Sequence, residues 1–411
     1  MTDQPGWKHA RVVDDEEVAG LQDVNDVLEH CVLDCAGGAI QHEQSRPPAF
    51  GRRLLSDELI RKIEIEVGDI HCQPPYLRLR FLQRPSFVFD VVIAGGGPAG
   101  LSAALLLGRC RRRVLLCDTG RPRNSRSQAL HGFLSRDGIS PLDLLRLGRE
   151  ELRRYGVESR QIAVDEVTPR GDRFDVRLAN GDDIEAFTVL LATGVVDHPP
   201  AIPGLDECYG ISVHHCPYCD GWEHRDHRIA VIGDKTSPAG LALSLKTWSD
   251  QVMAFSNGSK VRVAQREQLR AHDVPLHTRR IARIEHDAGQ VRAIVFEPQR
   301  STALGLKLPK DQSPKSKVDS ESRIPCDAIF FTAPQTQQCE LARRLGCEFT
   351  SKGTVRTDHL GKTCVKGIYV VGDASRDVQF VIVAAAEGAK AGVAINQALQ
   401  ARSGLIAEVQ R

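Results

Sequence analysis

The chain has 411 residues, 41% of them hydrophobic and 26% charged, which is the composition of a soluble globular protein with two or three domains. Its formal net charge is +1, and basic and acidic residues are interspersed, so we expect neither a nucleic acid nor an anionic membrane as partner. The N-terminus lacks the charged start and apolar core of a signal peptide, which predicts a cytoplasmic protein.

Residues 1–86 carry the weakest pattern in the chain. Apolar residues recur at helical spacing in segments 14–33 and 54–65. No motif of known chemistry accompanies them. We therefore predict an N-terminal extension that is helical or partly disordered.

A glycine-rich turn directly follows a predicted buried strand. Residues 88–94 are a near-continuous β-branched and apolar run, a small apolar helix is predicted at 99–107, and a second strand at 113–117 ends before an acid. In this context the glycines allow a tight turn and let a pyrophosphate approach the helix start, and the acid can bond a ribose hydroxyl. The candidate nucleotide contacts are Gly95, Gly97, Pro98, Ala99, Gly100 and Asp118. The glycines and proline also exclude a membrane span for the uncharged run at 91–108.

Short strands follow in the next part of the chain. Residues 162–188 alternate as strands do, and an Asn-Gly pair at 180–181 predicts a hairpin. A further buried strand at 189–194 ends in Thr193 and Gly194. This strand can rejoin the first sheet and bring its backbone against the nucleotide.

A pair of cysteines provides the candidate chemistry. Cys216 and Cys219 are separated by two residues and can close a small disulfide, which is a two-electron switch. If the pair opens a helix, the helix start lowers the cysteine pKa, and Asp220 can give or take a proton. The same spacing also serves as half of a zinc site. Further zinc ligands would be Cys208, His214 and His215. A second CxxC is missing from the sequence, which favours the redox interpretation over zinc.

A second nucleotide-type scaffold follows without its binding chemistry. The strand at 229–233 runs into a glycine, but Lys235 and Pro238 occupy the second and third glycine positions of the fingerprint. A side chain obstructs the pyrophosphate, and proline removes an amide donor. The next strand, at 251–255, is followed by Ser256 rather than by an acid or an arginine pair. These substitutions leave NADPH binding open.

The last strand and helix complete the pattern. Further strands are predicted at 279–296 and 326–331, with a flexible polar loop at 299–323. The strand at 367–374 contains Gly372 and Asp373 at its end, and a helix is predicted at 379–399, starting with Gln379. Asp373 can accept hydrogen bonds from a ribityl chain, and the helix start can place amides near the pyrimidine edge of a flavin.

Together these motifs resemble the low-molecular-weight thioredoxin reductase family of pyridine nucleotide-disulfide oxidoreductases. The motifs that carry the resemblance are at 95–100, 192–194, 216–221, 372–374 and 384–388. The resemblance implies an α/β fold with two Rossmann-like, three-layer domains and a discontinuous FAD domain. The implied boundaries are an extension at 1–86, a first FAD segment at 87–205, an inserted NAD(P)-type domain with the CxxC at 206–322, and a second FAD segment at 323–411.

The resemblance also implies roles for the candidate residues. Cys219 would face the flavin, Cys216 would exchange with the substrate, and Asp220 would be the acid/base. The ADP half of FAD would be held by Gly95, Gly97, Gly100 and Asp118, and the flavin half by Asp373 and Gln379. The implied partner is a small-molecule dithiol or a thioredoxin-like protein, and the implied assembly is a homodimer.

The departure at Lys235 and Pro238 is similar to that of a thioredoxin-reductase-like branch of dithiol oxidases. The resemblance therefore implies an FAD-dependent dithiol/disulfide oxidoreductase, with FAD as cofactor and NADPH open. The alternative is an oxygen-dependent dithiol oxidase that produces hydrogen peroxide without NADPH. A non-enzymatic flavin redox sensor is a third hypothesis.

Overall fold

The computed structural model describes the backbone of residues 63–67 and 77–81, and it describes residues 88–233, 237–298, 323–332, 334–375 and 378–406 in full. The chain divides into two compact units, Met1–Phe87 and Val88–Arg411. Within the described residues, none of the helices combines the length and apolar character needed to cross a membrane.

The described part of the first unit is a two-stranded ribbon. Strand β1 (Ile63–Val67) pairs antiparallel with β2 (Leu77–Phe81). The prediction of a helix through residue 65 is therefore wrong at its end. The sequence of β1, IEIEV, alternates with the period of two that favours a strand, and this alternation outweighs the helical spacing of the residues before it. The helix predicted at 14–33 lies outside the described residues.

The second unit contains a seven-stranded sheet built around β3 (Val88–Ala94). In sheet order its strands are β5 (Glu158–Arg160), β4 (Val114–Cys117), β3, β8 (Asp183–Leu191), β7 (Arg173–Leu178) and β6 (Val164–Arg170), and β19 (Ile368–Val370) also pairs with β8. The strands β5, β4, β3, β8 and β19 run parallel to one another. In contrast, β7 pairs antiparallel with both β6 and β8. The predicted return of the strand after residue 188 to the first sheet is confirmed, because β8 pairs directly with β3.

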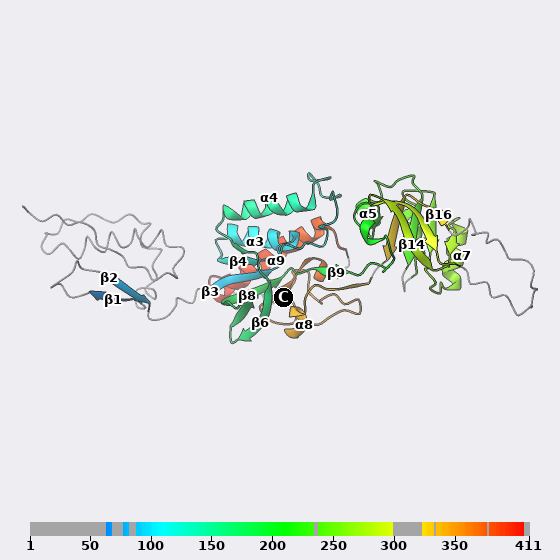
Figure 1. The fold of residues 1–411 in the computed structure, drawn as a ribbon. Helices are drawn as coiled ribbons and strands as arrows, with labels where there is room; N and C mark the ends of the chain where they lie inside the picture. Colours follow the sequence, from blue (N-terminus) through cyan, green and yellow to red (C-terminus); the bar gives the residue numbers. More distant parts are fainter. Residues whose placement is uncertain are drawn as a thin grey trace, which may run out of the picture. The chain divides into compact units, whose positions relative to one another are not determined.

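Helices cover one face of this sheet, as Figure 1 shows. They are α3 (Pro98–Arg109), α4 (Pro141–Arg153) and α9 (Val381–Arg402). Successive residues of β3 serve opposite faces: Val91 and Ile93 pack toward α3 and α9, whereas Val92 and Ala94 pack toward β6, β7 and the short helix α8 (Leu341–Arg344). The helices α3 and α9 approach closely, since a Cβ at Gly388 would collide with the backbone of Ala99. This contact holds the two ends of the domain's sequence together.

The inserted domain has a parallel sheet of its own. In sheet order its strands are β10 (Val213–His214), β17 (Ala328–Thr332), β11 (Ile229–Gly233), β12 (Val252–Phe255) and β13 (Leu276–His277). One face packs on α6 (Ala239–Leu245) and α7 (Val263–Ala271). The other packs on an antiparallel layer of β14 (Ile281–Asp287), β15 (Gln290–Phe296) and β16 (Arg323–Pro325). The predicted α/β class with two three-layer domains is confirmed.

The boundaries of the insertion differ from those we predicted. Strand β9 (Val195–Asp197) pairs antiparallel with β18 (Gln335–Gln337), where the chain leaves the first domain and returns to it. The predicted return at residue 323 is too early, because β16 and β17 pair with β15 and β11 of the inserted domain. The predicted start at 206 is too late, because Ile202 and Leu205 already pack in that domain's core. A polar stretch interrupts a domain as readily as it separates two, and only strand pairing distinguishes these cases.

Candidate active site

One cavity of about 450 Å³ brings the cysteine pair and the glycine-rich turn together. Its volume lies within the range of small-molecule sites in proteins. The sulfurs of Cys216 and Cys219 are joined in a disulfide, with their Cα atoms 5.3 Å apart. Apart from Gly100, the predicted site residues line the cavity: Gly95, Gly97, Pro98, Ala99, Asp118, Thr193, Gly194, Cys216, Cys219, Asp220, Gly372, Asp373 and Gln379.

The glycine end of the cavity fits a dinucleotide. A Cβ at Gly97, the residue that precedes α3, would meet no atom within 4 Å, so a ligand can approach the backbone there. Gly95 has a φ of +108°, which a side chain would strain, and a Cβ at Gly100 would collide with the Gly95 carbonyl. Asp118 follows β4 and accepts a hydrogen bond of 2.7 Å from Arg149. These positions suit a pyrophosphate at the start of α3 and a ribose beside Asp118.

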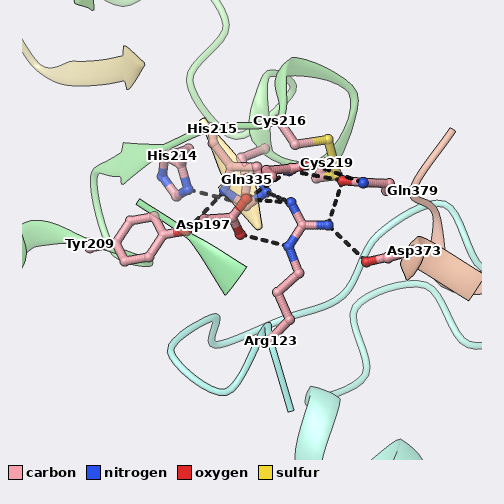
Figure 2. Close-up of a disulfide and its surroundings, with 11 residues drawn as sticks. Arg123, Asp197, Tyr209, His214, His215, Cys216, Cys219, Gln335, Asp373 and Gln379 are labelled. Atoms are coloured by element: carbon pink, nitrogen blue, oxygen red, sulfur yellow. Dashed lines mark hydrogen bonds and ion pairs between the residues drawn. A yellow bond between two sulfur atoms is a disulfide. The ribbon is translucent and has the colours of Figure 1, made fainter. Parts of the chain in front are cut away.

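At the end of the cavity away from the glycine-rich turn, Arg123 is hydrogen-bonded to several side chains at once, as Figure 2 shows. Its guanidinium donates hydrogen bonds to Asp197 at 2.6 and 2.7 Å, to Asp373 at 2.8 Å and to Gln379 at 2.6 Å. Burial opposes the charge, but the hydrogen bond and the charge of Asp197, followed by those of Asp373, raise the pKa of Arg123. Gln335 closes the cluster by donating to Asp197 at 2.7 Å and to Gln379 at 3.0 Å. A guanidinium paired with two carboxylates therefore lies among the residues predicted for the flavin half.

The sequence analysis missed Arg123 and Asp197, and no motif marks either residue. Arg123 lies in a polar segment between β4 and α4, and Asp197 ends the linker strand β9. A carboxylate at the end of a strand beside a candidate nucleotide site is a weak signal that could have drawn attention to Asp197. Only the folded chain brings these two residues together over 74 positions of sequence.

His215 connects this cluster to the disulfide. Its Nε2 lies 3.3 Å from Arg123 Nη2, and its Nδ1 lies 3.0 Å from the Tyr209 hydroxyl. Because a guanidinium only donates, we assign Nε2 as the acceptor, which puts the proton on Nδ1 and directs it to Tyr209. Burial lowers the pKa of His215 and raises that of Tyr209 to about 12, so both are neutral near pH 7. His215 immediately precedes Cys216 and thus links the charge cluster to the reactive pair.

The cysteine pair opens a helix, but a very short one. The helix α5 (Pro217–Asp220) is a single turn with Cys216 at its N-cap. The amides of Cys219 and Asp220 both donate to the Cys216 carbonyl at 3.3 Å. A single turn has a smaller dipole than a long helix. The expected lowering of the cysteine pKa by a helix start therefore has only limited support from the geometry.

Two buried histidines lie next to one another beside Asp220. His214 Nδ1 lies 3.2 Å from Asp220 Oδ1, and His214 Nε2 lies 2.9 Å from His224 Nε2. His214 is 7% exposed and His224 is 9% exposed. Burial, together with the nearby His214 and His227, lowers the pKa of His224 to about 4. The acid/base candidate is thus one end of a row of three side chains, in which Asp220 lies within ion-pair distance of His214 and His214 is hydrogen-bonded to His224.

The zinc interpretation receives no support from this arrangement. Both sulfurs of the pair are bonded to each other, and His214 and His215 are hydrogen-bonded to other side chains. Among the residues that the structure describes, no three or more His, Cys, Asp or Glu side chains are grouped so as to hold a metal ion.

Comparison with known proteins identifies the family of this chain. The family model described as pyridine nucleotide-disulphide oxidoreductase matches residues 89–388. The chain belongs to this family. It is 30% identical over 316 residues to a probable thioredoxin reductase of Arthroderma benhamiae, a match that covers 71% of this chain and 76% of the relative.

Two solved structures are similar to this oxidoreductase. The crystal structure of HlmI superposes with a TM-score of 0.70 and 34% identity, covering 77% of this chain and 94% of the other. A putative thioredoxin reductase from Bacillus anthracis gives a TM-score of 0.67 and 31% identity, covering 77% and 99%. The chain is a thioredoxin reductase-like flavoprotein, an FAD-dependent disulfide oxidoreductase that acts on sulfur groups.

The second nucleotide scaffold of this oxidoreductase differs from the first. Pro238 immediately precedes α6 with a φ of −73°, so the position that would be the third glycine offers no amide donor. After β12, the side chain of Asn257 accepts a hydrogen bond of 2.9 Å from the Ile281 amide at the start of β14. Asn257, the second residue after β12, therefore ties that strand end to β14. Lys235 lies outside the described residues.

The buried His224 predicts a loss of stability in acid. Its folded-state pKa is about 4, below the ordinary 6.5, so the unfolded chain takes up the proton first. The contribution is present above pH 6.5 and is lost as the pH falls toward 4, by at most roughly 3 kcal/mol. Urea unfolding at pH 7 and pH 4.5 measures it, and His224→Gln should lose less stability than the unsubstituted protein. Equal losses in both proteins would contradict this assignment, and His272→Gln, an exposed histidine after α7, is the control.

Proposed function

We propose that this flavoprotein passes electrons between a substrate dithiol or disulfide and FAD through the Cys216–Cys219 pair. The observation that carries the proposal is that the disulfide lines the same cavity as the dinucleotide-type turn at Gly95 and Gly97. A disulfide with a structural role has no reason to lie beside a cofactor site. The substrate we propose is a small-molecule dithiol or a thioredoxin-like protein. We also propose that the protein is a homodimer, and light scattering would measure its mass.

In the dithiol-oxidising direction, a substrate thiolate attacks the sulfur of Cys216. The Cys216–Cys219 bond breaks, Cys219 leaves as a thiolate, and the substrate becomes joined to Cys216 in a mixed disulfide. The second substrate thiol then attacks its own partner sulfur, which forms the substrate disulfide and releases Cys216. The substrate has lost two electrons, and the enzyme's pair has gained them. Disulfide reduction runs through the same steps in reverse.

Asp220 is the proposed acid/base of this exchange. It directly follows Cys219 in the sequence, and it lines the cavity. It can take the proton of the second thiol as that thiol becomes a nucleophile, and it can return a proton to a leaving thiolate. Its carboxylate is oriented by His214 at 3.2 Å.

The residues around the cavity fit FAD, which supplies a two-electron acceptor when bound. Gly97 and the start of α3 would hold the pyrophosphate, and Asp118 the ribose of the ADP half. Asp373 and Gln379 would contact the flavin half, with Arg123 as a neighbouring positive charge.

Exposed aromatic side chains flank the cysteine pair. Tyr218, between the two cysteines, is 68% exposed, and Trp222 is 64% exposed. Tyr218 lies edge-on to Trp248, with ring centroids 5.5 Å apart. Aromatic side chains of this kind offer contact area to a substrate at small cost in conformational entropy. We propose that the substrate approaches Cys216 over these rings.

A second candidate function is oxygen-dependent dithiol oxidation without NADPH. The specific observation that favours it is Pro238, which directly precedes α6 and removes an amide donor that a pyrophosphate would use. Ser256, which directly follows β12, offers no carboxylate to a ribose and supports it as well. In this variant the electrons would enter from the dithiol through the cysteine pair, and bound FAD would supply the chemistry that passes them to oxygen as hydrogen peroxide.

Anaerobic mixing distinguishes these functions. The yellow protein is mixed with NADPH and separately with dithiothreitol, and flavin absorbance is followed. We expect bleaching by the dithiol and negligible bleaching or binding with NADPH, with colour and peroxide returning when air is admitted. Rapid bleaching by NADPH would instead make the protein a disulfide reductase. Bleaching by neither reagent would contradict both functions.

A further inference from the structure

A row of three closely spaced side chains leads away from the cavity. Asp220 lies beside His214 of β10, and His214 lies beside His224, which follows α5. The outer ring is close to a further imidazole, since the centroids of His224 and His227 are 6.0 Å apart. His227 is exposed. The row therefore leads from the acid/base candidate toward the surface of the inserted domain, where His227 lies next to its outer end.

The surroundings of the row are mainly apolar. The ring of Phe330 packs against His214, with centroids 5.5 Å apart, and against His224, at 6.1 Å. The charged or titratable groups that act on His224 are His214, His227, Asp220 and Asp327. Asp327 is engaged by Arg228 at 2.6 and 2.9 Å, which compensates its charge. The low pKa of His224 keeps its ring neutral near pH 7, so its two nitrogens have opposite hydrogen-bonding roles.

The donors and acceptors can alternate along this row in two complete ways. When Asp220 is ionised, it faces a protonated His214 Nδ1 at 3.2 Å, and His214 Nε2 accepts from His224 Nε2. When Asp220 is protonated, it can donate to His214 Nδ1, and both imidazoles exchange tautomers. The two patterns differ by one proton, which enters or leaves at His224 Nδ1. Since each imidazole carries one proton in both patterns, a proton can move along the row without leaving a charge on either ring.

We propose that His214 and His224 relay protons between Asp220 and the solvent during dithiol–disulfide exchange. The inference rests on the proposed function, in which Asp220 takes a thiol proton. Oxidation of a dithiol to a disulfide releases two electrons and two protons. The electrons reduce the Cys216–Cys219 disulfide, one proton leaves with the first thiol's ionisation, and the second is taken by Asp220. The relay returns Asp220 to its ionised form before the next substrate arrives.

The test is His224→Gln in the flavin-containing protein. The glutamine amide can still donate to His214, but it cannot exchange a proton between two nitrogens. Anaerobic stopped-flow mixing with dithiothreitol follows flavin absorbance, and a pH-indicator dye follows proton release. In dilute buffer we expect flavin reduction to be about tenfold slower and proton release to be delayed. This effect is smaller than the whole contribution of acid/base catalysis, because Asp220 is still present. Raising the concentration of imidazole buffer should restore the rate in the variant and leave the unsubstituted protein unchanged.

Controls separate the relay from a packing role and from the proposed function. His272→Gln, at an exposed site after α7, should behave as the unsubstituted protein. In Asp220→Asn, adding His224→Gln should cause no further loss. If His224→Gln does not fold, His214→Gln tests the same link. An unchanged rate without buffer dependence would overturn the relay alone, whereas failure of dithiothreitol to reduce the unsubstituted protein would overturn the proposed function.

Discussion

Replacing Cys219 with serine is expected to leave FAD bound and to reduce dithiol-driven flavin reduction by at least about 1,000-fold. Serine preserves the size of the side chain but cannot form the disulfide that accepts the substrate's electrons. The disulfide closes onto the cavity that also contains Asp373 and the glycine-rich turn, so no other cysteine pair among the described residues offers the same route. Anaerobic stopped-flow mixing with dithiothreitol measures the rate, and the absorbance spectrum measures bound FAD.

The matched control for this substitution is Cys364→Ser. Cys364 is an exposed free cysteine of the second FAD segment, and its loss should leave both the spectrum and the rate unchanged. Unchanged flavin reduction in Cys219→Ser would show that electrons bypass the pair, and the role assigned to it would be wrong. Loss of FAD in the same variant would show that the cysteine contributes to cofactor binding instead.

Replacing Gly97 with glutamate is expected to yield a folded protein that is almost free of FAD. A Cβ at this position meets no protein atom within 4 Å, so the fold should tolerate the side chain. The carboxylate would extend into the space proposed for the pyrophosphate. Two unit charges about 4 Å apart near a protein surface repel by about 4 kcal/mol, which corresponds to roughly 1,000-fold weaker binding. Titration of the FAD-free protein with FAD, followed by fluorescence, measures the change.

The control for this prediction is Gly240→Glu. Gly240 lies in the first turn of α6, and a Cβ there likewise meets nothing within 4 Å, but it does not line the cavity. FAD affinity should therefore be unchanged. Urea unfolding of the FAD-free forms should give free energies within about 1 kcal/mol of the unsubstituted protein, since bound FAD would otherwise add its own stabilisation. Tight FAD binding by Gly97→Glu would place the pyrophosphate elsewhere.

Local patterns carried much of the fold. The β-branched run before Gly95, the small residues of α3 and the acid after β4 fix a strand, a turn and a helix through near-neighbour interactions alone. Sequence patterns were less informative where one segment was compatible with both a helix and a strand. The residues of β1 show this, because a helical spacing runs into a strict alternation.

Domain boundaries depended on pairing between distant segments. The strands β16 and β17 were assigned to the wrong domain because a polar stretch precedes them. Strand register joins them to β15 and β11, and register depends on which faces are buried rather than on local composition. The pairing of β9 with β18 likewise joins segments more than a hundred residues apart.

The sequence by itself determined the glycine-rich turn, the cysteine pair and the acid beside it, because each is a short motif whose chemistry follows from residue type and spacing. Only the tertiary structure decided which other side chains surround them. Arg123 meets Asp197 and Asp373 across 74 and 250 positions. His214 and His224 become candidates for a proton relay only because both are buried and their Nε2 atoms lie 2.9 Å apart. Such contacts depend on how whole layers pack, and no local pattern encodes them.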